Sequence, residues 1–209
     1  MKSIDKLLNS NTSEIGFNKQ NYKGVTKLNI LGLTSSQINE NKFECSSYIL
    51  SDIEKKSSKS KGKYINVNDT NKSIENFDFI ILQNTNETKI NLLSYEKPVG
   101  MQINHDTVLT ELRLSTLDSF DFDLYIYKIN NNLIFNFEEV LKMKDILNSI
   151  RSNWFIFLDE NNLSQEEIQY IYDLGFVGIV LDLDKLSLKD FNKIKTNIKK
   201  IEEKKNGKI

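Results

Sequence analysis

Eight short apolar runs recur along the chain, and each of them ends at a polar residue or a turn. Runs of this kind are typical of parallel strands that helices cover on both faces of a sheet. The recurrence therefore predicts an α/β protein with eight parallel strands. The predicted strands are Lys27–Leu33, Ser46–Asp52, Tyr64–Asn68, Asp78–Gln83, Val99–Asn104, Asp123–Lys128, Trp154–Asp159 and Val177–Asp182.

Helical periodicity fills the connections in the second half of the chain. Ser164 and Glu167 have the spacing of a capping box, and Gly175 is a typical residue to end the helix that they begin. The predicted helices are Thr107–Ser119, Phe137–Ile150, Leu163–Leu174 and a last helix that begins near Ser187.

The connections in the first half are shorter, because the first four runs begin at positions 27, 46, 64 and 78. A full crossover with its helix takes about 10 to 12 residues or more, so these connections have room for one or two helical turns each. The most polar of them is Asp52–Lys63, which we expect to be a loop. Helices in this half are predicted to be short or missing.

A chain of 209 residues with 39% hydrophobic residues is long enough for one domain with its own core. Alternating strands and helices favour a parallel sheet with right-handed crossovers, and eight strands permit closure into a barrel without exposed edges. The predicted fold class is α/β, with a single (β/α)8 TIM-like barrel domain over residues 1–209. An open doubly wound sheet and an irregular barrel are the alternatives.

Charge and composition exclude several classes of partner. The 28 basic and 29 acidic residues give a formal net charge of −1, which creates no overall field for nucleic acid. No stretch approaches the roughly 20 apolar residues of a membrane-spanning helix, and the single cysteine, Cys45, fits a reducing compartment. We expect a cytoplasmic protein with a small-molecule ligand and no nucleic-acid or membrane partner, and we leave a homo-oligomer open.

The segment Asn153–Leu183 (NWFIFLDENNLSQEEIQYIYDLGFVGIVLDL) resembles the last two strand–helix units of aldolase-type (β/α)8 TIM-barrel proteins. In that family a helix ends in a glycine-containing turn that leads into a strand, as Asp173–Val180 does here. The whole chain is most similar to an uncharacterised group of small bacterial barrel proteins, which has no assigned activity. The resemblance implies the barrel fold and leaves the function open.

In such barrels the active site lies where the strands end, because the following loops converge over a filled core. The strand ends of this chain are polar, which also suits the alternative that they form only the rim where strands leave the core. The polar residues are Thr34, Asp52, Asn68, Asp69, Gln83, Asn84, Asn104, His105, Asp106, Lys128, Asp159, Glu160, Asp182 and Asp184.

Lys128 is the first candidate catalytic residue. It ends the sixth run, and its position resembles that of the lysine in several Schiff-base aldolases. A buried amine can have a pKa low enough to attack a carbonyl group. The alternative is that Lys128 opens a solvated loop, Lys128–Asn132.

His105, the only histidine, is the second candidate and lies beside Asp106 just after the fifth run. A histidine next to a carboxylate can act as an acid, a base or a metal ligand near neutral pH. Asp106 is also well placed to cap the helix that is predicted to begin near Thr107, and we favour capping as its role.

Four acidic residues after the last two strands, Asp159, Glu160, Asp182 and Asp184, suit a Mg²⁺ site. Acidic residues also stabilise helix N-termini without a metal, so we favour the absence of a cofactor and leave metal use open. The two loops lack the glycines with which phosphate-binding barrels approach an anion, which disfavours a phosphorylated substrate.

Two functions from different classes remain. The first is a lyase or isomerase that acts on a small unphosphorylated metabolite, with Lys128, His105, Asp159 and Asp182 as candidate catalytic residues. This hypothesis rests on the chemistry that the fold often supports. The second is a non-catalytic barrel that serves as a binding or scaffold protein, which the short first half and the missing phosphate loops favour.

Overall fold

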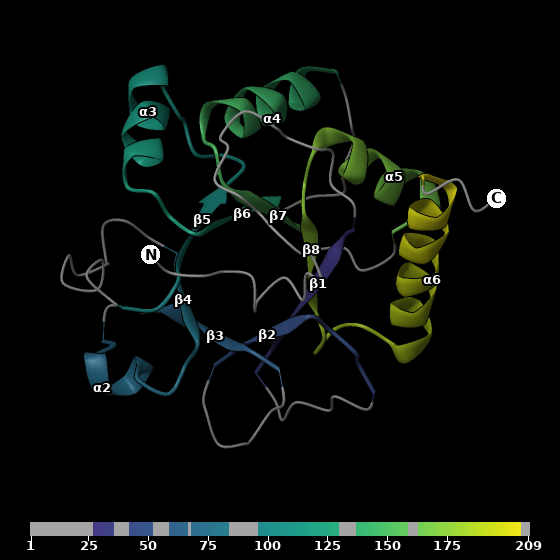
Figure 1. Cartoon of the computed structure of the whole chain (residues 1–209), viewed down its shortest axis with the longest axis horizontal. Helices are drawn as coiled ribbons and strands as arrows, with labels where there is room; N and C mark the ends of the chain where they lie inside the picture. Colours follow the sequence, from purple (N-terminus) through teal and green to yellow (C-terminus); the bar gives the residue numbers. More distant parts are fainter. Residues whose placement is uncertain are drawn as a thin grey trace.

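The computed structural model describes residues 27–35, 42–51, 59–66, 68–83, 96–129, 137–158 and 163–205 of the chain. Eight parallel strands close into a barrel in which each strand pairs with the next and β8 pairs with β1 (Figure 1). The predicted closed (β/α)8 barrel is therefore confirmed. The strands are β1 (Asn29–Thr34), β2 (Ser47–Leu50), β3 (Lys61–Ile65), β4 (Phe79–Leu82), β5 (Val99–Asn104), β6 (Leu124–Ile129), β7 (Asn153–Leu158) and β8 (Gly178–Asp182).

The helices lie outside the ring of strands and are unevenly distributed around it (Figure 1). Before β5, the four-residue α2 is the one helix of the described residues, so the predicted shortage of helices in the first half is confirmed there. None of the described helices is both long enough and apolar enough to cross a membrane. The helices are α2 (Asn71–Ile74), α3 (Glu111–Ser119), α4 (Phe137–Ser149), α5 (Gln165–Leu174) and α6 (Leu188–Lys205).

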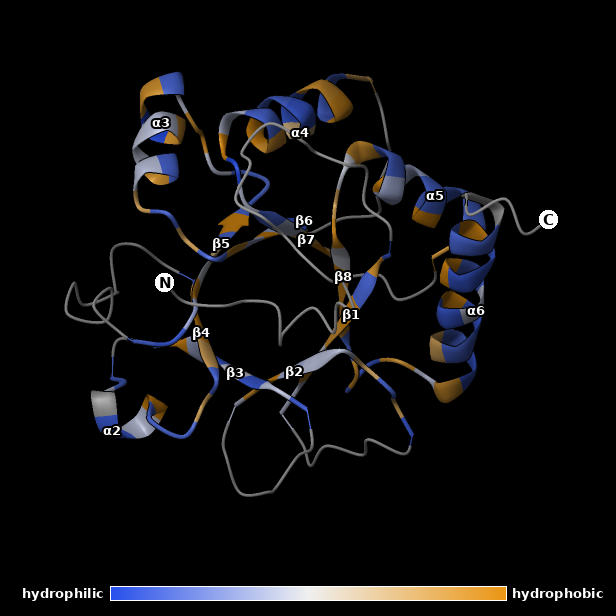
Figure 2. Cartoon of the chain, in the orientation of Figure 1, coloured by the Kyte–Doolittle hydropathy of each residue, from blue (hydrophilic) through white to orange (hydrophobic). Residues whose placement is uncertain are grey.

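Side chains that alternate along the strands build two separate cores, one inside the barrel and one between the strands and the helices. Ile126 belongs to the inner core, whereas its neighbours Tyr125 and Tyr127 belong to the outer core. In Figure 2 the helices α4, α5 and α6 carry both orange and blue, as expected for amphipathic helices over an apolar wall. The buried residues of the inner core are Leu31, Ile49, Phe79, Ile81, Leu124, Ile126, Phe155, Phe157 and Val180.

The predicted start and end of α5 are confirmed by its hydrogen bonds. The hydroxyl of Ser164 accepts from the backbone N–H of Glu167, whose carboxylate accepts from the backbone N–H of Ser164 at 2.7 Å. Gly175 follows the helix with a φ of 106°, a left-handed conformation that costs a glycine little. Ser187 caps α6 in a similar way, because its hydroxyl accepts from the backbone N–H of Asp190 at 3.2 Å.

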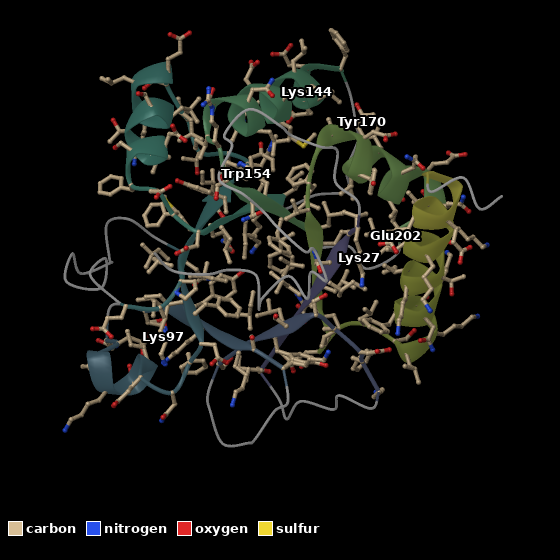
Figure 3. All side chains as sticks on the ribbon, in the orientation of Figure 1. Lys27, Lys97, Lys144, Trp154, Tyr170 and Glu202 are labelled. Atoms are coloured by element: carbon tan, nitrogen blue, oxygen red, sulfur yellow. The ribbon has the colours of Figure 1, made fainter. Side chains whose placement is uncertain are left out.

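A hydrogen bond also joins helix α6 to the residues just before β1, so the last helix contacts the start of the barrel. The backbone N–H of Leu28, next to β1, donates to Oε1 of Glu202 at 3.2 Å. Lys27 lies close to the same carboxylate (Figure 3). Burial raises the pKa of Glu202, and the bond from Leu28 opposes this shift because it favours the charged form.

The third strand begins at Lys61, whereas the sequence predicted a start at Tyr64. Its first residues therefore belong to the barrel and not to the predicted polar loop, whose earlier part lies outside the described residues. Lys63 is tolerated within the strand because its Nζ is paired with Oδ1 of Asp69 at 2.5 Å. The same ammonium lies 5.8 Å from the centroid of the Phe77 ring.

Helix α3 begins at Glu111, so the predicted start near Thr107 was wrong, and Asp106 does not cap this helix. The N-cap is Thr110, whose hydroxyl accepts from a backbone N–H in the first turn at 3.3 Å. Val108 is 82% exposed. The apolar stripe that predicted an earlier start therefore has no apolar surface to pack against at this position.

Candidate functional site

The carboxyl ends of β5, β6 and β8 bring three polar side chains to the inner side of the barrel wall. The residues two positions before Lys128 and Asp182 lie in the inner core, and residues two apart on a strand share a face, so these two side chains face inward. Asn104 is the register partner of Lys128 and points to the same side. We call these three residues, with Gln102 one layer below Asn104, the barrel mouth.

Lys128 is half-buried in the barrel mouth. Its Nζ lies 5.2 Å from the centroid of the Phe157 ring, and Phe157 is its register partner on β7. In the described part of the chain, no carboxylate lies within ion-pair distance of this ammonium. A lysine over an aromatic ring keeps its charge partly compensated and its nitrogen available to a ligand.

Asn104 and Gln102 form a chain of two amides on the inward face of β5. Nε2 of Gln102 donates to Oδ1 of Asn104 at 2.9 Å. Gln102 is only 6% exposed, and its Oε1 is buried without a hydrogen-bond partner among the described residues. A buried amide oxygen of this kind is costly and therefore needs a physical explanation.

Two acidic residues at the carboxyl end of β8, Asp182 and Asp184, stabilise the turn that follows this strand. Oδ1 of Asp182 accepts from the backbone N–H of Asp184 at 3.1 Å, and its Oδ2 pairs with Nζ of Lys185 at 3.0 Å. Asp184 in turn accepts from the hydroxyl of Thr34 at 2.6 Å and from the backbone N–H of Ser35 at 2.7 Å. These contacts join the end of β8 to the end of β1.

The predicted Mg²⁺ site is only partly represented in the described residues. Asp159 and Glu160 lie outside them, so the structure says nothing about these two candidates. Across the described ranges, no group of three or more His, Cys, Asp or Glu side chains could hold a metal ion. A metal site that includes Asp159 therefore stays a prediction.

His105 lies on the other side of the barrel wall from Lys128. Its Nδ1 is 2.9 Å from the hydroxyl of Tyr127, which belongs to the outer core, and its Nε2 is 2.9 Å from Oε2 of Glu139 on α4. Its backbone oxygen accepts from Nζ of Lys142 at 2.6 Å. The structure thus brings His105 to α4, on the opposite side of the barrel wall from Lys128 and Asp182.

Burial raises the pKa of the Tyr127 hydroxyl, and the nearby carboxylate of Glu139 adds to this effect. Tyr127 therefore stays protonated and is a hydrogen-bond partner of the His105 ring. Glu139 and Lys142 were not singled out from the sequence. No local signal could have identified them, because their relation to His105 depends on how α4 packs.

The other residue that sequence reasoning missed is Gln102, a polar side chain inside an otherwise apolar run. Counting back two positions from Asn104 would have placed it on the inward face of the strand. Tyr64 is a similar case on β3, because its side chain packs against the inner core and its hydroxyl is buried without a partner in the described residues. Burial raises the pKa of Tyr64.

The closed ring of eight parallel strands with polar carboxyl ends defines a TIM-barrel protein. Comparisons with solved structures agree. The chain is similar to a mutant tryptophan synthase alpha-subunit from the hyperthermophile Pyrococcus furiosus, with 10% identity, coverage of 85% of this chain and 98% of that chain, and a TM-score of 0.57.

Thiamine phosphate pyrophosphorylase from Pyrococcus furiosus is similar at 11% identity over 86% of this chain and 97% of that chain, with a TM-score of 0.56. The tryptophan synthase complex of the same organism matches at 8% identity over 83% and 97%, with a TM-score of 0.58. No family model and no curated protein matches the sequence. At these identities the likeness establishes the fold alone.

Proposed function

We propose that the barrel mouth binds a small unphosphorylated carbonyl compound and that Lys128 serves lyase or isomerase chemistry as the nucleophile. One observation carries this proposal. Lys128 places a half-buried ammonium inside the mouth, against the Phe157 ring and without a carboxylate at ion-pair distance in the described ranges. Lys63, another half-buried strand lysine, is neutralised by Asp69 at 2.5 Å.

The proposed step begins with the neutral amine of Lys128. Its lone pair forms a bond to the carbonyl carbon, and the carbonyl oxygen leaves as water together with the amine's two protons. This leaves a neutral imine, which takes up one proton from solvent. The protonated imine then withdraws electrons, so an adjacent C–C or C–H bond can break. Asp182 is the proposed proton acceptor in the described part of the mouth, and Asp159 remains a second acceptor proposed from the sequence.

The position of His105 supports leaving it out of this proton transfer, because its ring is held by Tyr127 and Glu139 outside the barrel wall. The name of one structural neighbour includes a phosphate ester. The last residue of β8, Asp182, and the turn that follows it, with Asp184, contain no glycine, which supports a substrate without a phosphate group.

Borohydride trapping tests the proposal. The protein is incubated with glycolaldehyde, glyceraldehyde or pyruvate, reduced with borohydride, and digested for mass spectrometry. We expect an adduct on Lys128 with at least one probe, and none on Lys63, which is the matched buried control. A Lys128→Met variant should lose the adduct. Modification of surface lysines only, with Lys128 unmodified by all three probes, would contradict the proposal.

A non-catalytic binding barrel is the second candidate function. It is favoured by the acidic residues at the end of β8, because Asp182 in the mouth and Asp184 beside it already accept hydrogen bonds within the chain. In that case the mouth binds a ligand without forming an adduct. Ligand binding that depends on Lys128 but gives no trapped product would support this second function.

Three further points belong to the proposal. We propose that residues 1–209 form one domain, that the protein works in the cytoplasm, and that it belongs with the small bacterial barrel proteins that it resembles. The closed barrel that spans residues 29 to 182 supports a single domain. Cys45 is buried and its pKa is raised to about 12, mainly by burial, which is compatible with a reduced thiol in a reducing compartment.

A further inference from the structure

The amide chain on β5 determines which hydrogen-bonding groups the barrel mouth offers. Gln102 is almost fully buried and donates through Nε2 to Oδ1 of Asn104 at 2.9 Å. This bond uses the oxygen of Asn104, and the Nδ2 group of the same amide is left for other partners. Asn104 is half-buried at the end of the strand, so its Nδ2 group lies at the mouth.

The alternative orientation of the two amides is less favourable. If both amides were turned over, Asn104 would donate to Gln102, and the buried Gln102 would be left with an unpaired NH2 group. That group has two donors, whereas the present orientation leaves one oxygen that is unpaired among the described residues. Unpaired buried acceptors are tolerated more often than unpaired buried donors. The orientation that leaves Oε1 of Gln102 unpaired is thus the same orientation that directs Nδ2 of Asn104 toward the mouth.

Lys128 adds a second hydrogen-bond donor beside the Nδ2 group of Asn104. Asn104 and Lys128 are register partners on neighbouring strands and share the inward face, so their side chains are next to each other. An ammonium and an amide NH2 group are both hydrogen-bond donors, so neither can accept a hydrogen bond from the other. A carboxylate has two oxygens that accept hydrogen bonds, and it matches such a pair in charge and geometry.

We propose that the barrel mouth binds the carboxylate group of a small carboxylic acid between Nζ of Lys128 and Nδ2 of Asn104, with Gln102 as a positioning residue. This inference rests on the mouth as the site in the proposed function and extends it to a class of substrate. A small 2-oxo acid combines both features, because its carboxylate binds between these two donors and its adjacent carbonyl carbon then lies close to Lys128, which loses a proton before its nitrogen attacks.

The test uses propanoate and propanamide, which have the same shape and lack a carbonyl carbon that an amine attacks readily. Binding to the full-length protein is measured by chemical-shift titration or ligand-observed NMR. We expect propanoate to bind about tenfold more tightly than propanamide, because hydrogen bonds to an ionised acceptor are about twice as strong as neutral ones.

Two variants separate positioning from structure. Asn104→Asp replaces the donor by a repelling carboxylate and should abolish propanoate binding. Gln102→Met removes the hydrogen bond that orients Asn104. The protein should still fold and bind both probes, but the affinity for propanoate should fall toward the affinity for propanamide. Lys142→Met, on the outer side of the wall, is the control and should keep the preference.

Equal binding of the two probes to the wild-type protein would overturn the inference, as would an unchanged preference in Asn104→Asp. If Gln102→Met does not fold, the Asn104→Asp result still decides. A preference for propanoate without any borohydride adduct on Lys128 would support this inference and contradict the imine chemistry. An adduct without that preference would contradict the inference alone.

Discussion

Tyr127 and Lys128 are consecutive residues of β6, and their side chains lie on opposite faces of the barrel wall. The hydroxyl of Tyr127 is 2.9 Å from the ring of His105 on the outside, and the ammonium of Lys128 lies over the Phe157 ring on the inside. Because side chains alternate along a strand, the candidate residues His105 and Lys128 lie on opposite sides of the barrel wall, although both stand at the ends of neighbouring apolar runs.

This separation gives the first prediction. A His105→Phe variant should leave the borohydride trapping of Lys128 within about twofold of the wild-type rate, because the two groups share no contact. The same variant should lower the free energy of unfolding, since it loses the contacts to Tyr127 and Glu139. A large loss of trapping with unchanged stability would show that His105 takes part in the chemistry.

A second prediction concerns the buried hydroxyl of Tyr64. Because this hydroxyl has no partner among the described residues, Tyr64→Phe should leave the free energy of unfolding unchanged or raise it by about 1 kcal/mol. The control is Tyr125→Phe, which loses a bond of 2.9 Å to the backbone oxygen of Leu117 and should cost about 1 kcal/mol. Urea denaturation of both variants measures the difference. A loss of stability in Tyr64→Phe would mean that the hydroxyl has a partner after all.

The pair of Lys63 and Asp69 makes stability depend on pH. Burial by itself raises the pKa of Asp69, but the hydrogen bonds from Lys63, the backbone of Asn66 and the hydroxyl of Ser73 outweigh it, so the pKa lies below its usual value of 3.8. A carboxyl whose pKa is lowered by folding stabilises the protein above its unfolded pKa and loses this contribution as the pH falls toward its folded pKa.

We therefore expect Asp69→Asn to lower the free energy of unfolding by about 2 kcal/mol at neutral pH. The difference from the wild type should stay constant as the pH falls to about 5 and should shrink below the unfolded pKa. Denaturant titrations at several pH values measure it. A difference that grew in acid would contradict the assigned sign.

The last prediction compares two glycines. A Cβ atom added at Gly178 would lie 2.4 Å from the ring of Phe155 and 2.6 Å from the backbone oxygen of Asn29, so Gly178→Ala should cost about 3 kcal/mol. At Gly175 nothing lies within 4 Å of an added Cβ, but φ is 106°, so Gly175→Ala should cost only about 1 kcal/mol. Thermal unfolding ranks the two variants. A smaller loss for Gly178→Ala would show that β8 can move away from its neighbours.

Some local features of this fold are readable in the sequence because they depend on neighbouring residues alone. The capping box of Ser164 and Glu167 is a bond between residues three positions apart, and it is present as predicted. The early start of β3 is not readable in this way. Lys63 is typical of a polar loop, and its place in the strand depends on its ion pair with Asp69.

The candidate site shows the same division. The sequence alone identifies Lys128 and Asp182 as polar residues at strand ends, and their inward orientation follows from alternation along β6 and β8. It does not reveal that Asp182 is already paired with Lys185, because that contact depends on the path of the turn after β8. Asp159, the fourth candidate, lies outside the described residues.

By itself the sequence determined that eight apolar segments form parallel strands, because burial on both faces leaves a pattern within each segment. Only the tertiary structure decided which polar residues meet. It placed Asn104 beside Lys128 and His105 against Glu139, since register and helix packing bring together groups that are distant along the chain. Such contacts depend on the closure of the whole barrel, and no local pattern records them.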